Sequence, residues 1–561
     1  WQALTGDASA FKAWGTSLKF LLYSAGTFVK GGLAASALAS LAACGKKSED
    51  ASAGATAQGG TFKFYINEPV AIDPYNTQET EGSQVESKLF DSLLGYDWEK
   101  EELVPKAAES WESNADATEF TFHLVKGAKF HNGDPVDAKS FKRGWERICN
   151  PNMSTPSEIN YHLAPVAGYA EMQASTATEL SGVTCPDDNT LVVKLSAPMA
   201  DFPYICAHIA LAPVPQAALD DPASFLLAPI GNGPFKMDGK WESGQYIDVV
   251  RFDDYYGEKP ILDGIHFSIQ KDPATAFREF EAGNIDFCQI PSGRLNETSE
   301  KYGTSEDGYT VTPKKQVLTG AQAAIYYLTL NLNDPTMADI NVRKAMSLAI
   351  NRQNIVDTLF EGSRKAANGF FPLIIDDDES NVWEFCKYDK DAAQKIVDEN
   401  NLAGTTITLS YNSGGGHEDI MSIVQGDLEA VGFKVEQSSM EWATYLTNLG
   451  DGRYQVGRLG WNADYPTMDN FLYPNFYSTA DNNYAKYVNA DVDAAIDAAR
   501  QVTDVEERKA AYRKINQTIA ESVPVIPLIF YALDHVGSDR VARMYLSPQN
   551  TADLASAALN A

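Results

Sequence analysis

The segment RLGWNADYPT, residues 458–467, places the carboxylate of Asp464 between two large aromatic residues, Trp461 and Tyr465, and just ahead of Pro466. A carboxylate in this position fits four roles: a solvated turn residue, a structural cap, a catalytic base, or the anchor of a cationic ligand group. Aromatic neighbours that partly exclude water strengthen its attraction for a cation. The surrounding chain decides among these roles.

The residues that usually carry catalytic or metal chemistry do not form a recognisable pattern. None of the seven histidines stands three or four residues from another in an expected helix, as a zinc-binding helix requires. The chain has no GxSxG motif, and the glycines at 414–416 lack the lysine that ends a phosphate-binding loop. We therefore predict a protein that is not an enzyme and has no metal and no cofactor.

Charge and length restrict the possible partners. The chain has 561 residues and a formal net charge of −31, with 44% hydrophobic residues. This length is typical of about two to four domains with a large core. An acidic surface repels nucleic acid phosphates and anionic lipid headgroups, so we expect no nucleic acid partner. The acidic field suits cationic ligands, although a solvated acidic surface is the more common explanation.

The first sixty residues differ from the rest. Residues 18–43 are rich in leucine and small residues and lead to Cys44 through Leu41-Ala-Ala, an arrangement that resembles a bacterial lipoprotein signal, whose cysteine sulfur carries a diacylglycerol. The alternative is a transmembrane anchor, but the apolar run 31–43 is shorter than the about 20 residues that a span needs. We predict a signal segment at 1–43, lipidation of Cys44 and a flexible tether at 44–60. The body is then extracytoplasmic and anchored to the cell membrane.

From Thr61 onward, strand and helix patterns alternate along the chain, which indicates an α/β architecture. The apolar segment 523–531 contains two prolines, which favours either an edge strand or a crossover between domains. Alternating segments predict strands at 61–66, 119–125, 190–195, 246–250, 264–269, 405–409 and 433–435. Helical spacing predicts helices at 83–94, 137–149, 339–350 and 419–431, and two helices within 491–521.

Six motifs occur in order along the chain: AAESW at 107–111 with FTFHLVKGAKFHNGDPV at 120–136, GNGPF at 231–235, DYYGEKPILD at 254–263, FEAGNID at 280–286, NVRKA at 341–345, and AINR at 349–352. Each motif alone is weak evidence, but their common order is specific. Together they resemble the oligopeptide-binding branch of the periplasmic-type solute-binding proteins that serve ABC importers, family 5.

The resemblance implies a two-lobed periplasmic-binding-protein fold of the class II type with an extra third domain. Such a protein works by hinge closure around a ligand and not by covalent chemistry. Its first domain is discontinuous. The implied pieces are 61–79, 202–323 and 532–561 for domain I, 80–201 for domain II, and 324–531 for domain III.

The resemblance also implies ligand-binding positions. In peptide-binding relatives the segment similar to RLGWNADYP lines the cleft, and its aspartate forms a salt bridge with the α-ammonium of the peptide. Family tryptophans form walls of the side-chain pockets, and an arginine, a glutamate and two tyrosines lie near the ligand. The matching positions in this chain are Asp464, Trp461, Trp442, Arg458, Asn462, Glu68, Tyr327 and Tyr531.

Each of these residues has a structural alternative. The tryptophans and tyrosines also suit a core, Arg458 suits a structural carboxylate as partner, Glu68 suits a solvated loop, and Asp464 suits a helix cap or a turn ahead of Pro466. The chain also departs from the family pattern, because Leu449 and Gly450 stand where an arginine and a histidine of a relative bind the peptide carboxylate. Arg453 lies nearby but out of register.

We therefore expect a monomeric, lipid-anchored binding protein that captures a short peptide and delivers it to the permease and ATPase subunits of an ABC importer. Asp464 fixes the register through the ammonium group, and backbone hydrogen bonds tolerate varied sequences. Three alternatives remain open at this point. The same fold binds dipeptides, nickel chelates, haem or oligosaccharides in other members of the family, and it also suits a surface receptor or adhesin. The third alternative is a hydrolase, which turnover of a bound peptide would reveal.

Overall fold

The computed structural model describes residues 59–76, 80–157, 159–378, 382–413, 416–480 and 482–560. The expected signal segment, Cys44 and all but the last two residues of the expected tether lie outside these ranges. In the described part of the chain, no helix combines the length and the apolar character needed to cross a membrane. The five cysteines within this part are free thiols: Cys149, Cys185, Cys206, Cys288 and Cys386.

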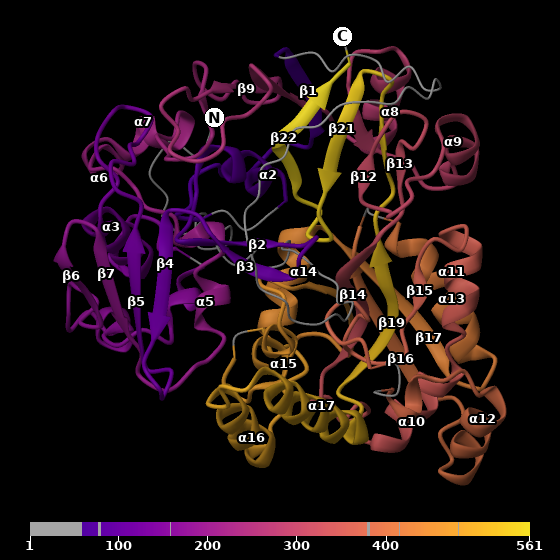
Figure 1. Cartoon of the computed structure of the whole chain (residues 1–561). Helices are drawn as coiled ribbons and strands as arrows, with labels where there is room; N and C mark the ends of the chain where they lie inside the picture. Colours follow the sequence, from indigo (N-terminus) through magenta and orange to yellow (C-terminus); the bar gives the residue numbers. More distant parts are fainter. Residues whose placement is uncertain are drawn as a thin grey trace, which may run out of the picture.

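A seven-stranded sheet forms the upper body in Figure 1. Its strands come from segments far apart in the chain, because β1 pairs in parallel with both β10 and β11 and β20 joins from near the C-terminus. A three-stranded sheet of β12, β21 and β22 lies in the same body. The strands of the large sheet, in spatial order, are β13 (Val317–Leu318), β20 (His535–Gly537), β11 (Phe287–Gln289), β1 (Thr61–Ile66), β10 (Gly264–Ile269), β9 (Tyr246–Arg251) and β8 (Phe235–Met237); the small sheet has β12 (Thr310–Val311), β21 (Val541–Leu546) and β22 (Ala552–Leu559).

A four-stranded antiparallel sheet forms a second body, indigo to magenta in Figure 1. In β5 alternate residues point inward, so that Phe120, Phe122 and Leu124 are buried. Asp137 caps the following helix by accepting a hydrogen bond from the backbone N–H of Ser140. The elements are β4 (Ala108–Ser113), β5 (Glu119–Leu124), β7 (Thr190–Lys194), β6 (Val183–Asp187), α3 (Ala138–Cys149), α4 (Tyr169–Gln173), α5 (Phe202–Ile205), and the hairpin β2 (Leu94–Asp97) with β3 (Glu102–Pro105).

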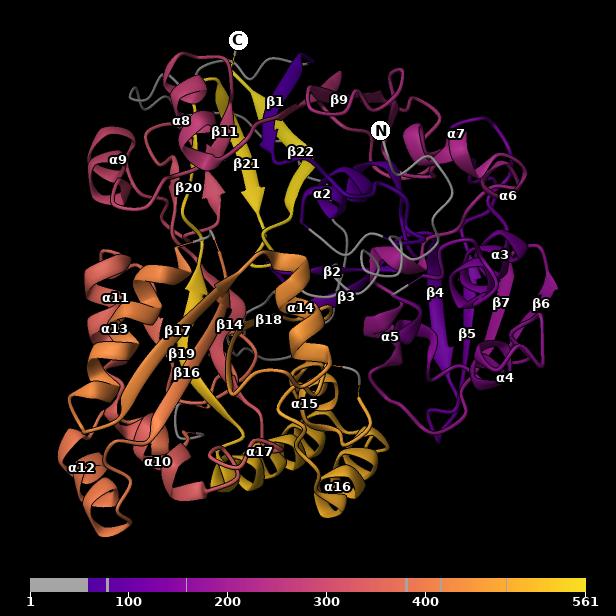
Figure 2. The same cartoon turned by 180° about the vertical axis from the view of Figure 1, so that it is seen from behind.

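A six-stranded mixed sheet forms the third body, and helices cover both of its faces (Figure 2). The pleat of β14 directs Ile325 and Tyr327 to the core beneath α14 to α17, and Tyr326 and Leu328 to the core beneath α10 to α13. The strands in order are β15 (Lys365–Ala366), β19 (Val525–Ala532), β14 (Ala321–Leu330), β18 (Val456–Asn462), β16 (Thr406–Asn412) and β17 (Lys434–Met440). The helices are α10 (Ile340–Ala349), α11 (Arg352–Leu359), α12 (Lys390–Glu399), α13 (His417–Glu429), α14 (Trp442–Gly450), α15 (Met468–Phe476), α16 (Ala490–Arg500) and α17 (Val505–Ser522).

Two strand connections join the third body to the first. The chain leaves the seven-stranded sheet after Leu318 and begins β14 at Ala321, and it returns from β19, which ends at Ala532, to β20 at His535. The long strand β19 is visible in Figure 1 as it rises from the lower sheet toward the upper one. The short links place the two bodies edge to edge, an arrangement suited to hinge motion.

The proline-containing strand was expected at an edge or at a crossover, and the crossover alternative is confirmed. β19 lies inside the sheet between β15 and β14, so the edge alternative is wrong. Its register against β14 shifts between Tyr326 and Tyr327, where Pro527 is the partner of Tyr327. Because proline has no N–H group to donate, an irregular register lets the strand continue without a complete ladder.

The helix expected at 83–94 is α2, Thr80–Leu89, so the predicted C-terminal boundary is wrong. The reason is a close backbone contact with the glycine-rich segment GNGPF. Gly233 N–H donates to the carbonyl of Leu89 at 2.8 Å, and a Cβ atom on Gly231 would lie 1.8 Å from that oxygen. The glycines therefore end the helix by direct contact. Val85 and Leu89 pack into the core of the seven-stranded sheet. The domain boundaries expected from the sequence stay a prediction.

Candidate ligand-binding site

A cavity of about 540 Å³, here called the central cavity, lies between the second and third bodies. One wall comes from residues 161–205, and the other comes from residues 461–501. The first wall includes Tyr161 and His162, and the second includes Trp461, Asp464 and Asn470. The structure thus places Asp464 and Trp461, both predicted from sequence, at the same cavity.

The carboxylate of Asp464 lies in this wall without a cationic partner. The residue is 5% exposed, and no Lys, Arg or His ion pair involves it in the described part of the chain. Its Oδ2 accepts a hydrogen bond from Asn470 Nδ2 at 3.0 Å and a longer one from the Tyr161 hydroxyl at 3.5 Å. Burial raises the pKa of Asp464 to about 7, because desolvation outweighs these two hydrogen bonds. A cation from a ligand would supply the missing charge.

Asn470, in the first turn of α15, holds the two predicted residues together. Its Oδ1 accepts hydrogen bonds from the indole Nε1 of Trp461 at 3.2 Å and from the backbone N–H of Asp464 at 2.8 Å. Trp461 is 6% exposed, and its ring both packs into the core and lines the cavity. One amide therefore sets the position of the carboxylate and of the aromatic wall beside it.

The lining of the cavity also contains a cation, Arg500, but its charge is already matched. Arg500 donates from Nε and Nη2 to the two carboxylate oxygens of Asp469, at 2.7 and 2.8 Å. Its guanidinium also lies 3.6 Å from the ring centroid of Tyr473. This bidentate pair neutralises Asp469, so Asp464 is the carboxylate of the α15 region that is left without an opposite charge.

Two histidines approach Asp464, although their sequence positions gave no sign of it. His162, His208 and Asp464 each offer a ligand atom within 4.8 Å of the others, a set that could hold a metal ion. However, His208 Nδ1 accepts a hydrogen bond from the backbone N–H of Ala210 at 3.2 Å, so the neutral ring carries its proton on Nε2. This tautomer withholds the Nε2 lone pair from a metal, and the arrangement fits a metal poorly.

Both imidazoles are neutral at pH 7. Burial lowers the pKa of His208 to about 4 and lowers the pKa of His162 well below its usual value. The rings stack with centroids 4.3 Å apart, and Nε2 of His162 has no hydrogen-bond partner in the described structure. Neither histidine therefore compensates the charge of Asp464.

The pleat of β18 separates the predicted residues of the RLGWN segment. Trp461 faces the core beneath α14 to α17, whereas Arg458 and Asn462 alternate with it and face the other side of the sheet. The Arg458 guanidinium lies 5.0 Å from the ring centroid of Tyr326 and donates to Asn412 Oδ1 at 3.4 Å. Asn462 ends the strand opposite Ala324.

Tyr531 lines a different cavity, of about 370 Å³, between the first and third bodies. Here this space is called the hinge cavity. Its wall also contains Arg364, whose guanidinium lies 4.9 Å from the Tyr531 ring centroid and 3.8 Å from Asp534 Oδ2, together with His417. Tyr327 is 2% exposed and donates from its hydroxyl to Asn475 Oδ1 at 3.1 Å, so it lies in the core.

The remaining predicted residues lie away from both cavities. Glu68 is exposed and accepts hydrogen bonds from Ser243 Oγ at 2.6 Å and from the backbone N–H of Gly244 at 2.7 Å. Trp442 begins α14, and its ring lies 6.1 Å from that of Tyr445. In the segment that departs from the family pattern, Leu449 is fully buried and Arg453 pairs with Asp451 at 2.9 Å.

Sequence reasoning missed Tyr161, His162, His208 and Asn470. Asn470 had a usable signal, because it lies in the first turn of a helix six residues after Asp464. Tyr161 had none, since 303 residues separate it from Asp464.

Comparisons with known proteins agree with this architecture. The model of "Bacterial extracellular solute-binding proteins, family 5 Middle" matches residues 102–483. The periplasmic oligopeptide-binding protein OppA of Haemophilus influenzae is 28% identical over 490 residues, which cover 83% of this chain and 86% of the relative. The dipeptide-binding protein DppE of Bacillus subtilis is 26% identical over 506 residues, 87% of this chain and 90% of the relative.

A solved structure gives the same result at the level of the fold. The crystal structure of Haemophilus influenzae OppA in complex with RPPGFSPFR superposes with a TM-score of 0.75 and 25% identity, covering 90% of this chain and 100% of that chain. The two-lobed α/β fold expected from the sequence motifs is thereby confirmed. The chain belongs to the bacterial extracellular solute-binding proteins of family 5.

Proposed function

We propose that this protein binds short peptides in the central cavity and delivers them to the permease and ATPase subunits of an ABC importer. The observation that carries the proposal is Asp464, a buried carboxylate without a cationic partner in the described chain, at a cavity of about 540 Å³. The α-ammonium of a peptide would supply the missing charge. The peptide-binding relatives support the same ligand class.

The walls of the cavity suit a peptide of varied sequence. Trp461 and Tyr465 offer aromatic surface beside the charge, and Tyr161 offers a hydroxyl from the opposite body. Because the two walls belong to different bodies, a ligand that contacts both favours the closed arrangement. The inserted third domain, with the boundaries expected from the sequence, supplies the wall that carries Asp464.

The other predicted contact residues fall into two groups, those near the hinge cavity and those with structural partners. Tyr531 lines the hinge cavity, where the Arg364 cation suits the carboxylate end of a ligand. Arg458 and Asn462 do not line this cavity, and their contact with ligand stays a prediction. Trp442, Tyr327 and Glu68 have structural partners, and their contact with ligand stays a prediction.

The experiment is isothermal calorimetry with tri-, tetra- and pentapeptides that have free or acetylated N-termini. Asp464→Asn keeps the shape of the side chain and removes the charge. We expect it to weaken binding of free peptides at least about 30-fold, as loss of one partner of a buried charge pair does. Acetylation of the peptide should weaken binding to the native protein by a similar factor and should weaken the variant no further.

Asp497→Asn is the matched control. Asp497 also lines the central cavity, but it is exposed and accepts a hydrogen bond from the Tyr477 hydroxyl at 3.1 Å. Its replacement should change affinity by less than about threefold, because exposed charges contribute little. Binding that is equally strong with and without a free N-terminus, or equally sensitive to both substitutions, would contradict the proposal.

The membrane anchor is a separate part of the proposal. Cys44 would carry the lipid and hold the body outside the cytoplasm at the membrane surface. Labelling of cells with a fatty-acid analogue should mark the native protein and should not mark Cys44→Ser. The unlipidated variant should appear in the soluble extracytoplasmic fraction, whereas unchanged membrane association would contradict the anchor.

A further inference from the structure

A third cavity adjoins the central one and has charged residues in its lining. This side cavity has a volume of about 420 Å³ and is lined by α2, by the β2–β3 hairpin and by the start of β22. It shares Asp464 and Tyr465 with the lining of the central cavity. A ligand that is held at Asp464 therefore has room to extend a side chain into the side cavity.

The side cavity contains a buried ammonium group, that of Lys88 in the last turn of α2. The residue is 3% exposed, and its Nζ is hydrogen bonded to the neighbouring Ser87 Oγ at 2.7 Å. In the described part of the chain, no carboxylate lies within ion-pair distance of it. Burial lowers the pKa of Lys88 to about 7, and it outweighs the more distant charge of Asp553, which raises this pKa.

The carboxylates that line the same cavity are occupied by other partners. Asp91 accepts hydrogen bonds from the hydroxyls of Tyr255 and Tyr256 at 2.6 and 2.8 Å, and Lys106 Nζ lies 3.2 Å from it. These contacts saturate Asp91, so it does not serve Lys88.

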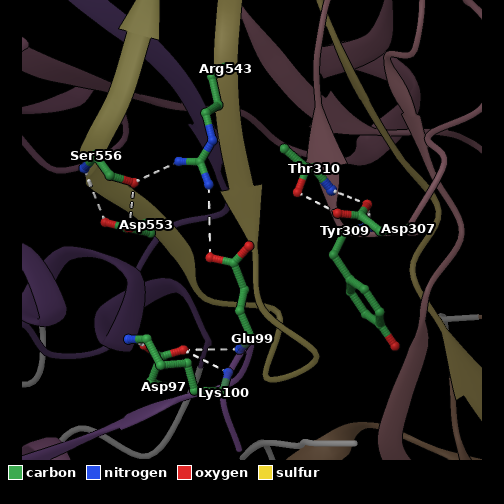
Figure 3. Close-up of polar contacts among 9 residues, drawn as sticks. All are labelled: Asp97, Glu99, Lys100, Asp307, Tyr309, Thr310, Arg543, Asp553 and Ser556. Atoms are coloured by element: carbon green, nitrogen blue, oxygen red, sulfur yellow. Dashed lines mark hydrogen bonds and ion pairs between the residues drawn. The ribbon is translucent and has the colours of Figure 1, made fainter. Parts of the chain in front are cut away.

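The other carboxylates of the lining are bonded locally, although the charge of Asp553 acts on Lys88 from beyond ion-pair distance. Figure 3 shows Asp553 accepting hydrogen bonds from the backbone and hydroxyl of Ser556, and Glu99 facing Arg543, with Oε2 3.8 Å from Nη2. Asp97 in the same view is held by Lys100. Lys88 and Asp464 are thus the two buried charged residues of the lining that have no opposite charge within 4 Å in the described structure.

The backbone fixes Lys88 in this position. Gly233 donates to the carbonyl of Leu89, and a Cβ atom on Gly233 would lie 2.8 Å from the carbonyl oxygen of Lys88 itself. Close backbone contacts with Gly231 and Gly233 therefore fix the position of the end of α2. The fold therefore fixes the backbone from which the Lys88 side chain extends, and Nζ is hydrogen bonded to Ser87 Oγ.

We propose that Lys88 binds the carboxylate of an acidic side chain at the first or second residue of a peptide whose ammonium group is held by Asp464. The inference rests on the proposed function and specifies its ligand class as peptides that are acidic near the N-terminus. One unpaired buried cation and one unpaired buried anion on the same cavity complement a ligand that carries both charges. Neutral peptides bind through Asp464 but leave Lys88 uncompensated.

The test compares peptides that differ only in charge: Ala-Glu-Ala with Ala-Gln-Ala, and Glu-Ala-Ala with Gln-Ala-Ala. Calorimetry at pH 7 on the full-length protein should show that it binds at least one glutamate peptide about tenfold or more tightly than the matching glutamine peptide. Lys88→Met retains length and apolar volume and removes the charge. The variant should bind both members of each pair with the affinity that the native protein has for the glutamine peptide.

Lys100→Met is the matched control, because it removes the same charge from an exposed site next to the hairpin, where Lys100 pairs with Asp97. It should keep the preference for glutamate. Lys88→Gln provides a second neutral variant should Lys88→Met fold poorly. Equal affinities of the native protein for glutamate and glutamine peptides would overturn the inference, as would a preference that survives in the Lys88 variants. Absence of binding for every free peptide would instead overturn the proposed function.

Discussion

Asn470 bonds to Asp464 twice: its Nδ2 donates to the carboxylate at 3.0 Å, and its Oδ1 accepts from the Asp464 backbone N–H at 2.8 Å. These two hydrogen bonds fix the position of the carboxylate and influence its ionisation. The hydrogen bond from Asn470 lowers the pKa of Asp464, against the larger effect of burial, which raises it. The central cavity thus holds a carboxylate that is stabilised only in part before a ligand arrives.

Replacement of Asn470 by leucine should weaken peptide binding at pH 7 by about tenfold to a hundredfold, since a hydrogen bond to a charged group contributes about 1.5–3 kcal/mol. The pKa of Asp464 should rise further, so the pH at which binding is half lost should move upward. Calorimetry across a pH series measures both effects. Reduced affinity with an unchanged pH midpoint would show that Asn470 acts only through packing.

Peptide affinity should depend on pH through Asp464. In the empty site its pKa is about 7, and the ammonium requires the carboxylate form, so binding releases a proton below pH 7. The dissociation constant should rise up to about tenfold per pH unit as the pH falls below 7. Above pH 8 affinity should fall again, because the α-amino group of a peptide has a pKa of about 7.7–8.0.

With neutral peptides, which do not engage Lys88, the groups next to Asp464 do not obscure this titration. His162 and His208 stay neutral, because their pKa values are lowered by burial, and the pKa of Tyr161 is raised well above its usual value. Calorimetry in two buffers with different ionisation enthalpies counts the protons released. Asp464→Asn should remove the acid limb of the profile, and constant affinity of the native protein from pH 5 to pH 7 would contradict this prediction.

The same substitution should stabilise the ligand-free protein. Between pH 4 and pH 7 the folded state keeps a proton on Asp464 that the unfolded state releases, so the carboxyl group makes the protein less stable as the pH rises through this window. At pH 8 Asp464→Asn should raise the free energy of unfolding by on the order of 2–4 kcal/mol. Thermal unfolding at pH 8 and at pH 4 tests this, because the gain should vanish at pH 4.

A buried ion pair joins the first and second bodies. Arg147 of α3 donates to both carboxylate oxygens of Asp73, at 2.8 and 2.6 Å, and its guanidinium lies 4.5 Å from the ring centroid of Tyr75. Asp73→Ala should lower the free energy of unfolding by about 3–5 kcal/mol, because it leaves a buried guanidinium unpaired.

The control for this ion pair is Asp188→Ala, which breaks the contact of Asp188 with Lys139. The side chain of Asp188 is 71% exposed and that of Lys139 is 63% exposed. It should cost less than about 1 kcal/mol. Denaturant unfolding of both variants provides the comparison. Similar losses for the two substitutions would mean that burial does not set the strength of the Asp73 pair.

The local elements were predictable where a single periodicity extended over the whole segment. Alternation at 61–66 and 264–269 predicted β1 and β10 with their observed limits, and the helix that follows Asp137 begins at Ala138. The helix at 83–94 was predicted too long, because its end is set by Gly231 and Gly233, which are more than a hundred residues away. For these segments the local pattern predicted the type of element, and a distant contact set the end of α2.

The sequence by itself determined the family and the α/β elements, and it predicted a ligand-binding role for Asp464 beside Trp461, because ordered motifs and short-range periodicities are properties of neighbouring residues. Only the tertiary structure decided which groups face Asp464, that Arg458 and Trp461 lie on opposite faces of β18, and that Lys88 is a buried cation. Desolvation and the absence of a counter-ion are set by segments that fold against one another from distant parts of the chain. The pKa of a charged residue, and its contribution to the free energy of folding or binding, depend on the side chains and the water that surround it after folding.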